Sequence, residues 1–121
     1  MKFKKNRANY SPLTPIDFLK RTAKIFPNYI SIISDNKKFT WKETFDRCSM
    51  FASSLIKSKI KAGDVVSIMA PNTYAMYEAH FAIPMAGAII NTINIRLDAK
   101  TISFIIKHSK TKLVFVDSEF L

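Results

Sequence analysis

The sequence predicts an α/β fold in which a parallel sheet is flanked by helices, and three observations support this. Residues 65–70, 88–93 and 113–117 are short runs that are apolar at most positions, as in strands buried on both faces. Segments with helical periodicity separate these runs. Alternation of this kind indicates βαβ units, whose strands are parallel. The chain has 121 residues, 48% of them hydrophobic, which is enough for one domain with its own core.

The first element is a basic lead-in, residues 1–13, that we expect to be extended. A helix is then predicted over residues 15–26. Thr14 can cap it, and Pro15 suits the first helical position because proline's fixed φ is helical and its missing N–H is not needed there. Pro27 ends the helix, since proline cannot continue the hydrogen-bond ladder.

A β-hairpin and a second helix are expected next. Residues 29–34 are rich in isoleucine and predict a strand. Residues 35–38 are turn formers, after which the chain returns. Thr40 is followed three positions later by Glu43, which is the spacing of a capping box. The capping box places the start of a helix over residues 41–58.

Two further helices separate the three apolar runs. The first is predicted over residues 73–86, and Pro84 bends or shortens it. The second is predicted over residues 99–109 with Asp98 as its cap. We expect the three apolar runs to be mutually parallel strands of one sheet.

The formal net charge of +10 is unevenly distributed, because residues 1–24 contain seven basic residues and one acidic residue. One interpretation is a basic arm for nucleic acid or an anionic membrane. The other is a solvated, lysine-rich surface, which we favour because no arginine-rich or aromatic pattern accompanies the charge. The sequence also lacks a helix-turn-helix signature and a zinc motif. We therefore expect no specific binding of nucleic acid.

Cys48 is the only cysteine, so the chain cannot form an internal disulfide. It lies on an apolar helical stripe, where a buried, inert thiol is expected rather than a nucleophile. No secretory signal is apparent, and no apolar run is long enough to span a membrane. Together with the absence of disulfides, this favours a cytoplasmic location.

Residues with obvious chemistry are scarce. The only glycines are Gly63 and Gly87, too few for a phosphate-binding loop. His80 either faces a pocket or is a structural histidine, and we favour the second interpretation. We expect no catalytic, cofactor-binding or metal-binding residue in this chain.

The loop that follows residues 88–93 is the best candidate for a binding region. Ligands gather at the carboxyl ends of parallel strands, and this loop contains Asn94 and Arg96. These two residues are our candidates for substrate binding. The alternative is that both side chains only brace the loop.

Three stretches of the sequence together resemble a known family over nearly the whole chain after residue 10. They are SPLTP (11–15) with Phe18-Leu19; TWKET (40–44) with Arg47-Cys48; and a long segment with GDVV (63–66), APN (70–72), MYE (76–78), HFA (80–82), PMAGA (84–88), Asn94, RLD (96–98) and Val116-Asp117. Their order and spacing resemble the N-terminal part of the adenylate-forming (AMP-binding) superfamily of acyl-CoA synthetases, luciferases and peptide-synthetase adenylation domains. Within this superfamily, the residues of these motifs are most similar to those of acyl-activating enzymes of bacteria and plant peroxisomes that act on short- or medium-chain acids.

This resemblance implies an ATP-dependent acid–thiol ligase of fatty acid metabolism. In such enzymes a carboxylate attacks the α-phosphate of ATP to give an acyl-adenylate and pyrophosphate. The thiol of coenzyme A then displaces AMP, and magnesium balances the phosphate charge.

The resemblance also implies a division of the chain. Residues 14–121 would form the N-terminal part of an AMP-binding domain, truncated at its C-terminal side. The family's phosphate loop, magnesium-binding glutamate and C-terminal lysine come later and have no counterpart here. We therefore expect the chain alone to be inactive, to bind none of ATP, coenzyme A or magnesium, and to be an incomplete folding unit. Its partners would be the remainder of the ligase and, in the full enzyme, a small carboxylic acid.

Two alternatives to the ligase remain at this point. One is a non-catalytic, stand-alone interaction module on the same scaffold, and the other is a small basic nucleic-acid-binding protein. A reading frame that continues beyond Leu121 would favour the ligase over the stand-alone module.

Overall fold

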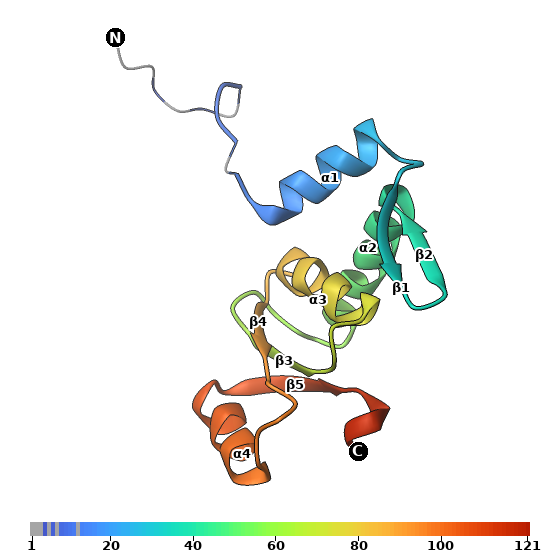
Figure 1. Ribbon diagram of the computed structural model, residues 1–121. Coiled ribbons are helices and arrows are strands. Elements are labelled where there is room, and N and C mark those ends of the chain that lie inside the picture. The colour runs from blue at the N-terminus through green and yellow to red at the C-terminus, as the bar shows by residue number, and fades with distance from the viewer. Residues whose placement is uncertain (1–3, 5, 7, 12) are drawn as a thin grey trace.

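The computed structural model describes residues 4, 6, 8–11 and 13–121, and it confirms the predicted α/β fold (Figure 1). No helix in these residues is both long and apolar enough to cross a membrane. The expected lead-in lies partly outside the described residues. The elements are α1 (Pro15–Ile25), β1 (Ile30–Ser34), β2 (Lys37–Thr40), α2 (Trp41–Lys57), β3 (Val65–Met69), α3 (Tyr74–Met85), β4 (Ile89–Thr92), α4 (Ala99–His108), β5 (Thr111–Val116) and a short 3₁₀ helix, η1 (Ser118–Phe120).

As predicted, the three apolar runs form one parallel sheet, and the structure shows its strand order to be β4–β3–β5. Val66 of the central strand pairs with Ile90 on one side and Leu113 on the other. β1 and β2 form a separate antiparallel hairpin. Each βαβ connection passes through a helix, which is the connection that parallel neighbours require.

The main core lies between the sheet and the α2–α3 pair. Leu55 of α2, Val66 of β3 and Ile83 of α3 are all buried in this cluster. A smaller cluster, Leu19 with Cys48, attaches α1 to α2 and α3. In Figure 1, α4 lies on the side of β5 away from α2 and α3, and it contains no fully buried residue.

A cluster of polar side chains ties the three sheet strands to the end of α4. The Ser67 hydroxyl is fully buried and shares a hydrogen bond of 2.6 Å with the hydroxyl of Thr111. The side-chain amide of Asn91 donates to Ser67 Oγ at 2.9 Å and to Ser109 Oγ at 3.3 Å. Because these four residues satisfy one another, the cluster allows a serine in an otherwise apolar strand.

Helix boundaries agree with the predictions to within one residue, but two strands begin two residues earlier than predicted. The predicted turn over residues 35–38 is too long, because β2 already begins at Lys37. Asp35 adopts a left-handed φ of 51°, which aspartate tolerates better than most residues, so two residues suffice for the turn. β5 begins at Thr111 rather than 113, because Thr111 pairs with Val65 at the end of the ladder.

Candidate functional site

The carboxyl ends of β3 and β4 open into a depression at one edge of the sheet. Because the two strands are parallel, the loops that leave them lie side by side. The backbone N–H of Ile93 donates to the carbonyl oxygen of Ile68 across this gap at 2.8 Å. The depression has a volume of about 490 Å³, and α3 forms its third wall. It is lined by Ala70, Pro71, Asn72, Met76, His80, Thr92, Ile93, Asn94, Ile95 and Arg96.

Asn94 and Arg96, the two candidates from the sequence, both line this depression. The side-chain oxygen of Asn94 accepts a hydrogen bond from the backbone N–H of Arg96 at 2.9 Å, so Asn94 shapes the loop. The Arg96 side chain is exposed, and within the described part of the chain its guanidinium forms no hydrogen bond or ion pair. Arg96 therefore offers a cation at the rim of the depression.

His80 reaches the same depression from α3. Its Nδ1–H donates to the carbonyl oxygen of Met76 at 2.8 Å, and this contact assigns the proton of the neutral ring to Nδ1. Nε2 is then left as an acceptor. His80 is thus both held by its own helix and placed in the lining of the depression.

The lining chemistry suits an anionic, oxygen-rich ligand better than a metal ion. Arg96 supplies five N–H donors, and the amides of Asn72 and Asn94 add neutral polar groups. Within the described residues, no group of three or more histidine, cysteine, aspartate or glutamate side chains is arranged to hold a metal ion. We therefore assign no residue to metal binding.

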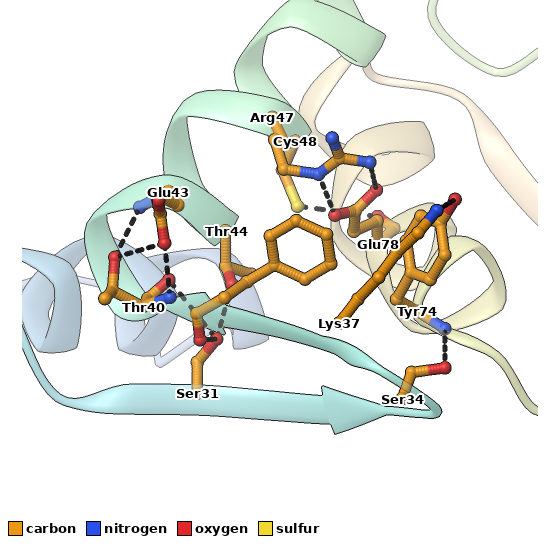
Figure 2. A network of polar contacts seen from close by, with 11 residues as sticks. Ser31, Ser34, Lys37, Thr40, Glu43, Thr44, Arg47, Cys48, Tyr74 and Glu78 are labelled. Atoms are coloured by element: carbon orange, nitrogen blue, oxygen red, sulfur yellow. Dashed lines mark hydrogen bonds and ion pairs between the residues drawn. The ribbon is translucent and has the colours of Figure 1, made fainter.

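A second polar centre lies between α2, α3 and the hairpin (Figure 2). Arg47 forms an ion pair with Glu78 through its Nε, and its Nη2 donates to the second carboxylate oxygen at 3.0 Å. The side chain of Glu78 is only 7% exposed, and that of Arg47 is 36% exposed. The hydrogen bond to Glu78 also raises the pKa of the Arg47 guanidinium. The geometry is bidentate, which is the strong form of this contact.

Aromatic rings enclose this ion pair. The Arg47 guanidinium carbon lies 4.6 Å from the centre of the Phe39 ring and 5.3 Å from that of Tyr74. Figure 2 shows Tyr74 beside Lys37, whose Nζ donates to the Tyr74 hydroxyl at 3.0 Å. Arg47 thus holds α2 to both the hairpin and α3.

Cys48 follows Arg47 on the buried side of α2 and is fully buried. Burial, and next the neighbouring Glu78 carboxylate, raises the pKa of its thiol to about 12. At neutral pH the residue is therefore an uncharged thiol, and the predicted burial of Cys48 is confirmed.

The family of this protein is decided by comparison with known sequences. Residues 19–120 match the family model described as AMP-binding enzyme. The chain belongs to the AMP-binding enzyme family. This finding confirms the resemblance deduced from the sequence motifs.

Relatives within the AMP-binding family include CoA ligases of Arabidopsis thaliana. The chain is 56% identical over 113 residues to the peroxisomal butyrate–CoA ligase AAE11, covering 93% of this chain and 20% of the relative. It is 55% identical over the same length to the peroxisomal benzoate–CoA ligase, again covering 93% and 20%. The chain therefore spans about a fifth of the length of these relatives.

A solved structure with the same fold is the unliganded O-succinylbenzoate coenzyme A synthetase (MenE) from Bacillus subtilis. It superposes with a TM-score of 0.81 at 24% identity, covering 86% of this chain and 23% of that chain. At this identity the comparison establishes the fold alone, and the chain has the fold of about a quarter of that synthetase.

The Arg47–Glu78 pair is the main feature of this AMP-binding chain that sequence reasoning missed. Glu43 stands four positions before Arg47, which is the spacing of an ion pair within a helix. Glu43 instead serves the capping box, and Arg47 turns to Glu78, which lies 31 positions along the chain. One signal was available: Glu78 is the only charged residue of α3, and a lone acid in an apolar helix needs a partner.

The capping box at the start of α2 predicts a pH dependence of stability. A Glu43 side-chain oxygen accepts hydrogen bonds from the backbone N–H of Thr40 at 2.8 Å and from its hydroxyl at 2.9 Å. These bonds lower the pKa of Glu43. A lowered folded-state pKa means that the stabilisation is present above the unfolded value, about 4.3, and is lost as the pH falls through the folded value.

We therefore expect Glu43→Gln to lower the unfolding temperature at pH 7, because glutamine keeps an acceptor but loses the charge. The difference from the parent chain should shrink as the pH falls below the unfolded value and through the lowered folded-state pKa, where the parent carboxylate protonates. Circular dichroism melting curves at a series of pH values would measure it. A difference that stays constant down to the acid limit would contradict the assignment.

Proposed function

We propose that this chain is part of an acid–thiol ligase that activates a short- or medium-chain carboxylic acid with ATP and transfers the acyl group to coenzyme A. The observation that carries the proposal is the identity of about 55% to two CoA ligases along 93% of the chain. Membership of the AMP-binding family supports the use of ATP.

The proposed reaction has two steps. A carboxylate oxygen attacks the α-phosphorus of ATP, the bond to the bridging oxygen breaks, and pyrophosphate leaves. The thiol sulfur of coenzyme A then attacks the acyl carbon, the bond to the adenylate oxygen breaks, AMP leaves, and the thiol proton passes to solvent. Magnesium would supply charge neutralisation at the phosphates, and we assign no residue of this chain to it.

We propose an electrostatic role for Arg96 in this reaction. All three reactants are anions, and Arg96 presents at the rim of the depression a guanidinium that has no ion-pair partner among the described residues. A bidentate cation of this kind attracts and orients phosphate or carboxylate oxygens. Asn94 supports it by holding the backbone N–H of Arg96.

We also propose that this segment does not select the acid. The butyrate and benzoate ligases differ in the acid they are named for, yet they match the chain equally well. The selecting residues therefore belong to the rest of the ligase. The chain by itself would then lack the means to form an adenylate, and its partner would be that remainder.

A chimera tests the proposal most directly. The matching segment of the Arabidopsis butyrate ligase would be replaced by this chain, and formation of butyryl-CoA would be measured. We expect an active chimera that keeps the butyrate preference of its parent. Arg96→Ala should lower kcat/KM about ten- to a hundredfold, the equivalent of losing one charge-assisted hydrogen bond.

The matched control is Lys100→Ala, which removes an exposed cation four positions later and outside the depression lining. It should leave kcat/KM nearly unchanged. A folded but inactive chimera would count against the ligase and favour a non-catalytic module. ATP–pyrophosphate exchange by the isolated chain above background would contradict the proposal that it is inactive alone.

The compartment stays a prediction. We propose the cytoplasm from the sequence, whereas the Arabidopsis relatives are named as peroxisomal. Imaging a fluorescent fusion of the full-length ligase in its own cell decides between the two compartments.

A further inference from the structure

The surface at the end of α1 exposes a continuous set of apolar side chains. Phe26 and Tyr29 pack edge to face, with ring centres 5.6 Å apart, and Tyr29 is 67% exposed. Together with Ile30 and Trp41 they line an apolar groove of about 300 Å³. We call Ile25, Phe26, Tyr29, Ile30 and Trp41 the α1-end patch.

Helix α1, which leads into the α1-end patch, carries apolar side chains on an exposed flank as well as on its buried side. Its inner side is anchored by the buried Leu19. Phe18 and Ile25, seven positions apart and therefore on one flank, are both about half exposed. The apolar flank is thus turned toward solvent beside the patch rather than into the core.

The helix that leads into this apolar surface also carries positive charge. Lys20, Arg21 and Lys24 are exposed on α1, and within the described residues none of them forms an ion pair. Asp17 is the only acid of α1, and its carboxylate accepts a hydrogen bond from the Thr14 hydroxyl at 2.6 Å. Lys20, Arg21 and Lys24 are therefore exposed on the same helix as the exposed Phe18 and Ile25, a combination that the sequence pattern did not reveal.

We propose that the α1-end patch docks onto an anionic lipid surface. Interfacial binding requires apolar side chains that enter the acyl boundary, aromatic rings at headgroup level and cations for anionic headgroups, and this surface supplies all three. Tyr29 and Trp41 are the two ring types enriched at membrane interfaces.

Other occupants fit less well. A second copy of the chain would bring Lys20, Arg21 and Lys24 close to their own equivalents, and like charges repel. A nucleic acid would use the cations and could stack on rings, but Ile25 and Ile30 offer it no stacking surface. An anionic bilayer uses both the cations and the aliphatic side chains.

Trp41 provides a built-in reporter, because it is the only tryptophan of the chain and lines the groove. The chain would be mixed with vesicles of phosphatidylcholine alone or of phosphatidylcholine with phosphatidylserine. We expect co-sedimentation and a blue shift of Trp41 fluorescence with the anionic vesicles only. Binding should weaken as salt rises from about 0.1 M to 1 M, where the Debye length falls from about 10 to 3 Å.

Two variants separate the contributions. The triple change Lys20→Gln, Arg21→Gln and Lys24→Gln should lower the partition coefficient roughly a hundredfold or more, from the attraction that each cation contributes near an anionic surface. The second variant, Tyr29→Ser with Ile25→Ser, removes exposed apolar area and should abolish the blue shift while the charge is kept.

Helix α4 supplies the matched controls, since Figure 1 places it at the far end of the molecule from α1. It carries the exposed Phe104 and the exposed Lys100 and Lys107, and Lys110 follows it. Phe104→Ser, and the triple change of these lysines to glutamine, should leave vesicle binding and the Trp41 shift unchanged.

Several outcomes would overturn the proposal. They are no binding to anionic vesicles, equal binding to neutral vesicles, or loss of binding in the α4 variants rather than the α1 variants. A second copy of the chain would be the occupant if the chain self-associates without lipid and the Tyr29→Ser with Ile25→Ser variant does not.

The rest of a ligase would cover the patch if the isolated chain binds vesicles but the butyrate-ligase chimera does not. Because vesicle binding and ligase activity are separate measurements, failure of one leaves the other standing.

Discussion

Replacing Arg47 by leucine is expected to lower the free energy of unfolding by about 3 kcal/mol. Removal of one partner from a buried ion pair typically costs about 3–5 kcal/mol, and this change should fall at the lower end of that range. Glu78 would be left as a carboxylate that is only 7% exposed and has lost both of its guanidinium contacts. The lower end applies because the Arg47 side chain is itself 36% exposed. The stacking on Phe39 and Tyr74 would be lost as well. Urea denaturation followed by circular dichroism measures the change.

Two comparisons identify the cause of that loss. The double variant Arg47→Leu with Glu78→Leu should recover most of the stability, because an apolar pair of similar size carries no desolvated charge. The matched control is Lys42→Leu, which breaks the Lys42–Asp46 pair of the same helix, whose side chains are 65% and 49% exposed. Its effect should be at most about 1 kcal/mol. Equal losses for Lys42→Leu and Arg47→Leu would refute the argument from burial.

Features that depend on neighbouring positions in the chain were predictable from the sequence. Thr14, Thr40 and Asp98 cap their helices as predicted, because each cap is a contact between residues three positions apart. The parallel direction of the three sheet strands was predictable too, since apolar strands separated by helices permit few other arrangements.

Features that depend on distant positions were not predictable. Arg47 and Glu78 are 31 positions apart, and although the apolar setting of Glu78 in α3 calls for a partner, no sequence pattern shows that the partner is Arg47. Ser67 is a polar residue within an apolar run, and its partners Thr111 and Asn91 lie 44 and 24 positions further along the chain. Only the folded chain brings these groups within hydrogen-bond distance.

The candidate site falls between these two cases. Asn94 and Arg96 were found from a general rule about the ends of parallel strands, and the structure places both in one depression. The rule could not place His80 there, since the direction of an α3 side chain depends on how that helix packs on the sheet. It also could not distinguish Asn94, which supports the loop, from Arg96, which faces solvent.

Replacing Leu55 by alanine is expected to cost about 2–5 kcal/mol, a large part of the about 5–15 kcal/mol that stabilises a typical domain. Leu55 is 1% exposed and packs in the core between α2, α3 and the sheet. The truncation removes apolar contacts and leaves a cavity that rigid neighbours such as Val66 fill poorly. The urea midpoint should fall with little change in slope, since the surface exposed on unfolding stays similar.

Ile56 offers a control one position further along the same helix. It is 57% exposed, so Ile56→Ala removes a comparable side chain from the same helix without making a cavity. Its effect should stay within about 0.5 kcal/mol, as for most surface substitutions. If Leu55→Ala and Ile56→Ala lower the urea midpoint equally, then the α2 face assigned to the core is wrong. A lower midpoint for Leu55→Ala alone requires that α2 packs through Leu55 into the core that it shares with α3 and the sheet.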